Sequence, residues 1–152
     1  MNPSDPVQDI MHRTMYNLRY IETRATSDGP YEVTQLINSF LGALAHPWEE
    51  NKPRLNETTL DEANKRGWPE LKNERAEGND PTSLGDLLRL VRNAFAHGNI
   101  EFIPRPNNEI ESIRFWNNNR EGSRTWETIL TVSDLRNFLA RFVDLADEIH
   151  AK

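Results

Sequence analysis

The stretch from residue 83 to 99, SLGDLLRLVRNAFAHGN, constrains the fold more than any other part of the chain. At about 3.6 residues per turn, its large apolar side chains fall on one side of a helix: Leu84, Leu87, Leu88, Val91 and Phe95. Thr82 or Ser83 can cap the start of this helix, with Asp86 in a capping-box position relative to Ser83, and Gly98 suits the position that ends it. After Gly98 the helical period gives way to the alternation of β-strands. The sequence therefore predicts a core-packed helix followed by a sheet.

The side of this helix opposite to the apolar stripe carries a different set of residues. Asn93 and His97 are four positions apart and lie one above the other, with Leu90 on the same side and Arg92 on the flank. A histidine in a last helical turn interacts favourably with the helix dipole, and an arginine can hold a carboxylate. The spacing alone therefore favours ordinary structural roles over a functional site.

Length and composition limit the class of protein. A chain of 152 residues can form one domain with its own core, and we expect a single domain over residues 1–152. The absence of cysteine excludes disulfides and thiolate metal sites and is typical of a reducing compartment. No apolar run is long enough to span a bilayer, and the N-terminus lacks the pattern of a signal peptide. We therefore expect a cytoplasmic protein that does not enter a membrane.

The net charge of −6 argues against a broad, non-specific surface for nucleic acids. It leaves room for a small basic site, because several arginines fall in the central third of the chain: Arg89, Arg92, Arg105, Arg114, Arg120 and Arg124.

Three other segments have the apolar period of amphipathic helices. Helices are predicted from Ser4 or Asp5 to residues 27–29, from Pro30 to residues 46–47, and from a cap at Ser133 onwards. The first helix is expected to bury one face: Val7, Ile10, Met11, Thr14, Leu18, Ile21 and Ala25.

Residues 48–81 are charged, rich in Pro and Asn, and poor in core residues. They are predicted to form a long polar loop with one short helix at Thr58–Lys65, held to the body by Trp68.

Residues 99–132 show the pattern of a three-stranded antiparallel meander. The strands are predicted at Ile100–Ile103, Ile110–Trp116 and Thr125–Val132. The predicted fold is mainly α. It is a four-helix up-and-down bundle with this small β-meander between the third and last long helices.

The segment RNAFAH, residues 92–97, resembles the Arg-x4–6-His motif of the HEPN superfamily. Proteins of this superfamily are small helical bundles that carry the motif near the end of a late helix, with a polar residue after the arginine, as Asn93 is here. The order of helices, loop, motif helix, meander and final helix resembles a bacterial subgroup associated with plasmids and defence.

The resemblance implies a metal-independent ribonuclease, a toxin or a defence effector, that needs no cofactor. In such an enzyme His97 would be the general base or acid for attack by the 2′-hydroxyl group. Arg92 would bind the phosphate, and Asn93 would orient the imidazole or the substrate. Arg92 and His97 diverge by about 140° on an ideal helix and therefore do not share one face.

The resemblance also implies partners. Family members dimerise so that two motifs face one cleft, and the face bearing Leu90 would suit such a homodimer. RNA is the implied substrate, and an antitoxin protein the implied partner of a toxin. Some antitoxins modify a tyrosine two residues past the motif histidine, but Asn99 stands there in this chain. The alternative is a non-catalytic module that uses the same polar cleft to bind a nucleotide or a partner protein.

Overall fold

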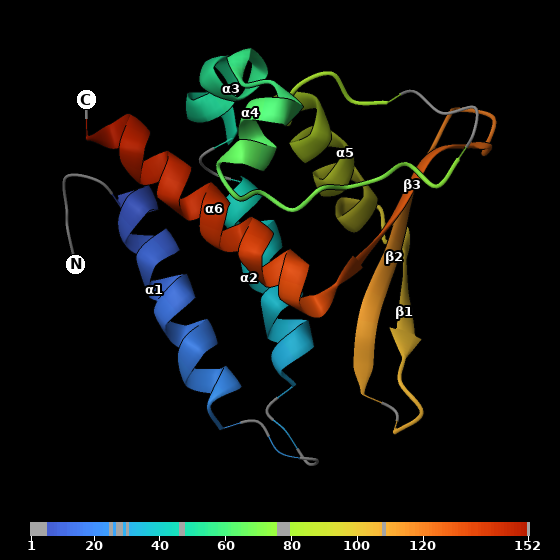
Figure 1. Cartoon of the computed structure of the whole chain (residues 1–152). Coiled ribbons are helices and arrows are strands. Elements are labelled where there is room, and N and C mark those ends of the chain that lie inside the picture. Colours follow the sequence, from blue (N-terminus) through green and yellow to red (C-terminus); the bar gives the residue numbers. More distant parts are fainter. Residues whose placement is uncertain are drawn as a thin grey trace. The chain divides into compact units, whose positions relative to one another are not determined.

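The computed structural model describes residues 6–24, 26, 29, 31–45, 48–75, 80–107 and 109–151. Within them the chain forms helices and strands in this order: α1 (Pro6–Glu22), α2 (Glu32–Ala45), α3 (Trp48–Glu57), α4 (Leu60–Lys65), α5 (Leu84–Ala96), β1 (Ile100–Pro104), β2 (Ile110–Asn118), β3 (Arg124–Thr131) and α6 (Val132–His150) (Figure 1). The described chain is mainly helical with one antiparallel sheet, as the sequence predicts. The up-and-down arrangement of four helices stays a prediction.

The chain divides into two compact units. The first contains Met1–Asn51 and Leu139–Lys152, and the second contains Lys52–Phe138. The helix α6 contributes to both, since the division falls between Phe138 and Leu139. The motif helix α5 and the whole sheet belong to the second unit.

The first unit is built from α1, α2 and the C-terminal part of α6. Its core consists of buried apolar side chains on these helices: Met11, Met15, Leu18, Leu36, Phe40, Phe142, Leu145 and Ala146. One predicted core residue is wrong, because Ile10 is 54% exposed while Met15, which was not predicted, is buried. Gln8 and His12 of α1 both contact the Asp147 carboxylate of α6, at 2.9 Å, so a polar contact joins the two helices at the surface.

The helix α1 ends earlier than predicted, at Glu22 rather than near residues 27–29. Thr26 and Gly29 exchange two backbone hydrogen bonds of 3.1 Å in a tight turn, and Gly29 has a φ of 114°. A helix cannot continue through such a turn. The predicted starts at Ser4, Asp5 and Pro30 lie outside the described residues.

The predicted meander is confirmed. The strands pair antiparallel in the order β1-β2-β3, with Phe115 opposite Ile100 on one side and Thr128 on the other. The face of the sheet that carries Phe115 is covered, because the Phe115 ring lies 5.2 Å from Phe95 of α5 and 5.8 Å from Trp126 of β3, measured between centroids. The sheet therefore packs directly on the motif helix.

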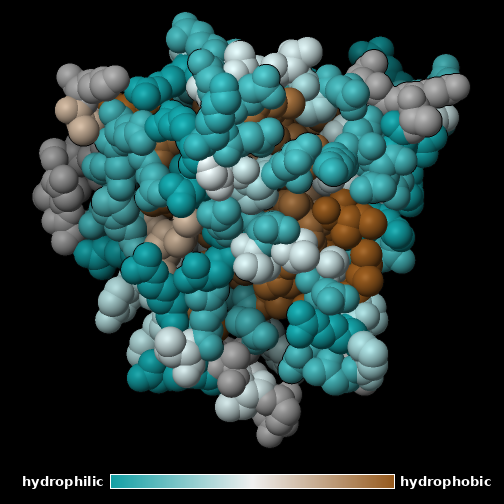
Figure 2. Space-filling view, in the orientation of Figure 1, coloured by the Kyte–Doolittle hydropathy of each residue, from teal (hydrophilic) through white to brown (hydrophobic). Residues whose placement is uncertain are grey.

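The edge of β3 that does not pair with β2 forms hydrogen bonds with the segment after α4. The Glu74 N–H donates to the Glu127 carbonyl at 2.8 Å, and the Asn73 side-chain oxygen accepts from the Glu127 N–H at 3.3 Å. These contacts cover an edge that could otherwise pair with another chain. The surface is mostly hydrophilic in Figure 2, with an apolar area where Figure 1 draws β2 and β3.

The prediction of a long polar loop over residues 48–81 is wrong in its first part. The helix α3 occupies Trp48–Glu57 despite Pro53 in its interior, and α4 follows at Leu60–Lys65. A proline within a polar stretch argues against a helix on local grounds. Tertiary burial outweighs this cost, because the Leu55 side chain is fully buried. The predicted short helix at Thr58–Lys65 is confirmed as α4. Trp68 does hold the segment, with its ring 5.0 Å from Phe138 in edge-on contact.

A capping box begins α4. The Thr59 hydroxyl accepts from the Glu62 N–H at 3.2 Å, and the Glu62 carboxylate accepts from the Thr59 N–H at 3.0 Å and from the Thr59 hydroxyl at 3.0 Å. These hydrogen bonds, the backbone one first, hold the pKa of Glu62 below its ordinary value. The ionised carboxylate therefore stabilises the folded chain above the pKa of the unfolded state. This contribution is lost as the pH falls through the lower, folded-state pKa.

We expect the substitution Thr59→Ala to raise the Glu62 pKa towards its ordinary value, since one of the two Thr59 donors is removed. An NMR titration of the Glu62 side chain measures this. Thr58→Ala is the matched control, because the Thr58 hydroxyl donates to the Arg54 carbonyl and not to Glu62. Equal Glu62 pKa values in the two variants would contradict the attribution of the lowered pKa to hydrogen bonds from Thr59.

Candidate functional site

The helix α5 positions the candidate residues. The Ser83 side chain, one of the two caps that the sequence predicts, caps its start by accepting from the Asp86 N–H at 3.1 Å. The capping box is incomplete, because the Asp86 carboxylate accepts from the Thr82 hydroxyl at 2.8 Å instead. At the other end Gly98 has a φ of 67°, and the Asn99 N–H reaches back to the Ala94 carbonyl at 2.9 Å. Both ends of the helix are thus set by local hydrogen bonds.

The two sides of α5 differ as the sequence predicts. The side towards the core is fully buried: Leu84, Gly85, Leu87, Leu88, Val91, Ala94 and Phe95. Arg92, Asn93 and Leu90 are half-buried, and His97, the C-cap residue, is exposed. The candidate residues therefore lie at the surface, on the last turns of a helix whose other side is fixed in the core.

Gly85 brings the start of α5 close to the end of α3. A Cβ atom at this position would lie 3.1 Å from the Asn56 backbone nitrogen and would clash with the Asn56 side-chain oxygen. The Leu84 N–H also donates to the Thr58 carbonyl at 2.9 Å. The segment that was predicted as a loop therefore supports the N-terminal end of the motif helix.

Asn117 fixes the outer side of α5 next to the candidate residues. Its side-chain amide donates to the Leu90 carbonyl at 2.7 Å, from the end of β2 where the strand register shifts. This contact is not predicted, because the predicted strand ends at Trp116, before Asn117. A polar residue at a strand end next to a long helix was the available signal.

Arg92 differs from six other arginines of the described chain. Each of these six pairs with a carboxylate: Arg13, Arg89, Arg105, Arg114, Arg124 and Arg141. Within the described ranges, the side chains of Arg92, Asn93 and His97 form no hydrogen bond or ion pair with another protein group. Arg92 therefore does not pair with a carboxylate among the described residues, which was the structural role considered for it.

The helix does not bring Arg92 and His97 onto one face. They are five positions apart, so their side chains leave the axis in directions about 140° apart and about 7.5 Å along it. Asn93 does share a face with His97, and the His97 N–H donates to the Asn93 carbonyl at 3.0 Å. One chain thus presents Asn93 and His97 together, with Arg92 to the side.

His12 and the acidic residues that the structure describes offer no second site of the same kind. His12 lies at the surface with its Nε2 atom 2.9 Å and 3.0 Å from the two Asp147 oxygens, which fits a surface ion pair. Among the described residues, no three His, Asp or Glu side chains gather closely enough to hold a metal ion. No described helix combines the length and the apolar character that crossing a membrane requires.

A family model described as HEPN pEK499 p136 matches residues 1–152. No curated protein and no solved structure matches the chain.

Proposed function

The chain belongs to the HEPN pEK499 p136 family, and we propose that it is a metal-independent endoribonuclease that acts as a homodimer. One observation carries this proposal. Arg92, Asn93 and His97 lie outside the core at the end of α5. Within the described ranges, their side chains form no hydrogen bond or ion pair with another protein group. Polar side chains that stabilise a fold normally form hydrogen bonds with other protein groups, whereas side chains that bind a substrate have hydrogen-bond donors available for the substrate.

The proposed reaction is an internal transfer at one phosphate of RNA. The 2′-hydroxyl loses its proton, and its oxygen forms a bond to the adjacent phosphorus. The bond from phosphorus to the 5′-oxygen breaks, and that oxygen gains a proton. The products are a 2′,3′-cyclic phosphate end and a 5′-hydroxyl end, so no water or external reactant is consumed.

His97 would move one of these protons, because imidazole changes its charge near neutral pH. The Arg92 guanidinium would bind the phosphate and stabilise the extra negative charge on its oxygens in the transition state. Asn93, on the same face as His97, would orient the imidazole or the substrate.

A homodimer explains how two diverging side chains can act on one phosphate. With two copies of α5 facing one cleft, Arg92 of one protomer can approach the partner's His97. The His97 imidazole of one protomer can then move a proton at a phosphate that the partner's Arg92 binds. Asn93, His97 and the half-buried Leu90 would form the facing surface.

The test is cleavage of single-stranded RNA of mixed sequence by the purified protein in the presence of EDTA. We expect cleavage that leaves 2′,3′-cyclic phosphate ends, and no cleavage of the same RNA when it is fully 2′-O-methylated. Cleavage that EDTA abolishes, or products with 3′-hydroxyl ends, would contradict the mechanism. Stabilisation by nucleotides without any turnover would favour the non-catalytic binding module instead.

A further inference from the structure

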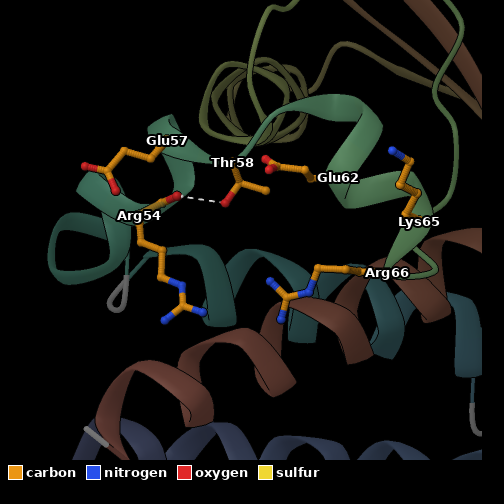
Figure 3. Close-up of a pocket in the computed structure, with 6 residues that line it drawn as sticks. All are labelled: Arg54, Glu57, Thr58, Glu62, Lys65 and Arg66. Carbon is orange, nitrogen blue, oxygen red and sulfur yellow. Dashed lines mark hydrogen bonds between the residues drawn. The ribbon is translucent and has the colours of Figure 1, made fainter.

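A second polar feature of the same unit is a hollow beside α3 and α4. It has a volume of about 400 Å³ and is lined by Arg54, Glu57, Thr58, Glu62, Lys65 and Arg66 (Figure 3). Arg54 and Glu57 lie in the last turn of α3 and Thr58 follows it, whereas the last three residues belong to α4 or follow it directly. The hollow is thus formed by one short, continuous stretch of the chain.

The guanidinium groups of Arg54 and Arg66 point towards one another across this space, whereas Lys65 and Glu57 point away from it (Figure 3). The Glu62 carboxylate is held at the α4 cap by two hydrogen bonds from Thr59. The Thr58 hydroxyl donates to the Arg54 carbonyl at 2.9 Å and so ties the turn to α3.

Two guanidinium groups that converge on one space form a site for an anion that accepts several hydrogen bonds. Their planar arrays of donors match the oxygens of a phosphate group.

The hollow lies at the opposite end of α5 from the candidate catalytic residues. The Leu84 N–H donates to the Thr58 carbonyl, and Thr59 pairs with Ser83, so the hollow adjoins the first residue of this helix. His97 follows its last residue, which places the two sites about 20 Å apart along the axis. An RNA strand a few nucleotides long can span this distance.

We propose that Arg54 and Arg66 bind a backbone phosphate of the RNA strand whose cleavage takes place at Arg92 and His97. This inference rests on the ribonuclease function proposed above. The site would position the strand without taking part in the reaction.

The test uses the full-length protein and a 2′-O-methyl RNA oligonucleotide. This oligonucleotide has no free 2′-hydroxyl group and therefore cannot be cleaved by the proposed reaction. We expect the double variant Arg54→Gln/Arg66→Gln to bind it about tenfold more weakly than the wild type. A plot of the logarithm of the association constant against the logarithm of the salt concentration should become less steep by about 0.7. This is the change expected when one phosphate contact on a single strand is lost. With cleavable RNA, KM should rise and kcat should stay unchanged. Lys52→Gln is the matched control, because this exposed lysine of α3 does not line the hollow.

The outcomes separate this inference from the proposed function. Equal affinity and equal salt slope in the double variant and the Lys52→Gln control would overturn the phosphate site, even if RNA is cleaved. A mononucleotide that binds through the same arginines as tightly as the oligonucleotide would overturn the assignment to a strand. Absence of RNA cleavage would refute the ribonuclease, and the binding comparison would still report on the two arginines. If the double variant does not fold, the single variant Arg66→Gln, at an exposed position, gives the same comparison.

Discussion

Replacing His97 with alanine is expected to lower the rate of RNA cleavage by about 10²–10⁴-fold, the usual contribution of a general acid or base. The side chain is exposed at the C-cap of α5, so the free energy of unfolding should change by no more than about 0.5 kcal/mol. Cleavage rates and denaturant unfolding of the same preparations measure both quantities. If the protein is a toxin, expression of the wild type should stop the growth of the host cells, and expression of the His97→Ala variant should not.

Two control variants make this result specific. His12→Ala removes a surface histidine of the other unit, and Arg89→Ala removes an exposed cation of α5 that is paired with Asp86 at 3.6 Å. Neither should change the cleavage rate appreciably, whereas Arg92→Ala should reduce it as severely as the histidine variant. Arg92→Lys should recover part of the loss, since lysine keeps the charge but not the planar donors. A His97→Ala protein that cleaves at the wild-type rate would refute the proposed site.

The dimer can be tested with the same variants. An Arg92→Ala protomer and a His97→Ala protomer are each expected to be inactive alone. A mixed dimer retains one intact arginine and one intact histidine on different protomers, and should regain activity if these residues meet across the cleft. Mixing that restores no activity, while the two proteins do exchange subunits, would contradict a shared cleft.

The substitution Phe115→Ala is expected to lower the free energy of unfolding by about 3–5 kcal/mol, because it removes a fully buried ring from the centre of the second unit. The ring contacts Phe95 of α5 and Trp126 of β3, so its loss leaves a cavity between the sheet and the motif helix. Denaturant unfolding followed by tryptophan fluorescence measures this change.

Phe102→Ala is the matched control for this stability effect. Phe102 lies on the same face of the sheet, next to Ile113 in the register, but on the edge strand β1, and it is 44% exposed. We expect a loss of about 1 kcal/mol or less. Equal losses in the two variants would mean that the contact between β2 and α5 does not stabilise the unit as described.

Several features of the chain could be predicted because their causes are local. The stripe from Leu84 to Phe95, the cap at Ser83 and the positive φ of Gly98 depend on residues within a few positions of one another. The alternation of side chains likewise predicts the three strands and their order, since short turns leave few other ways to pair them. The placement of Arg92, Asn93 and His97 outside the core follows from the same helical period.

Other features could not be predicted because their causes lie far apart in the sequence. The helix α3 looks unfavourable locally and forms where Leu55 becomes buried. The cap of α6 is Thr131, whose hydroxyl accepts from the Asp134 N–H at 3.0 Å, and not the predicted Ser133, since β3 runs directly into the helix. No local pattern predicts the contact of Asn117 with Leu90, which are 27 positions apart.

The sequence by itself determined which residues face away from the core on the motif helix, because a helical period is read from one short segment. Only the tertiary structure decided what surrounds that helix. Asn73 and Glu74 cover the edge of β3, and Arg54 and Arg66 converge in the hollow beside the first turn of α5 (Figure 3). The physical reason is that such contacts form only after burial of distant apolar residues has fixed the paths of the segments between them.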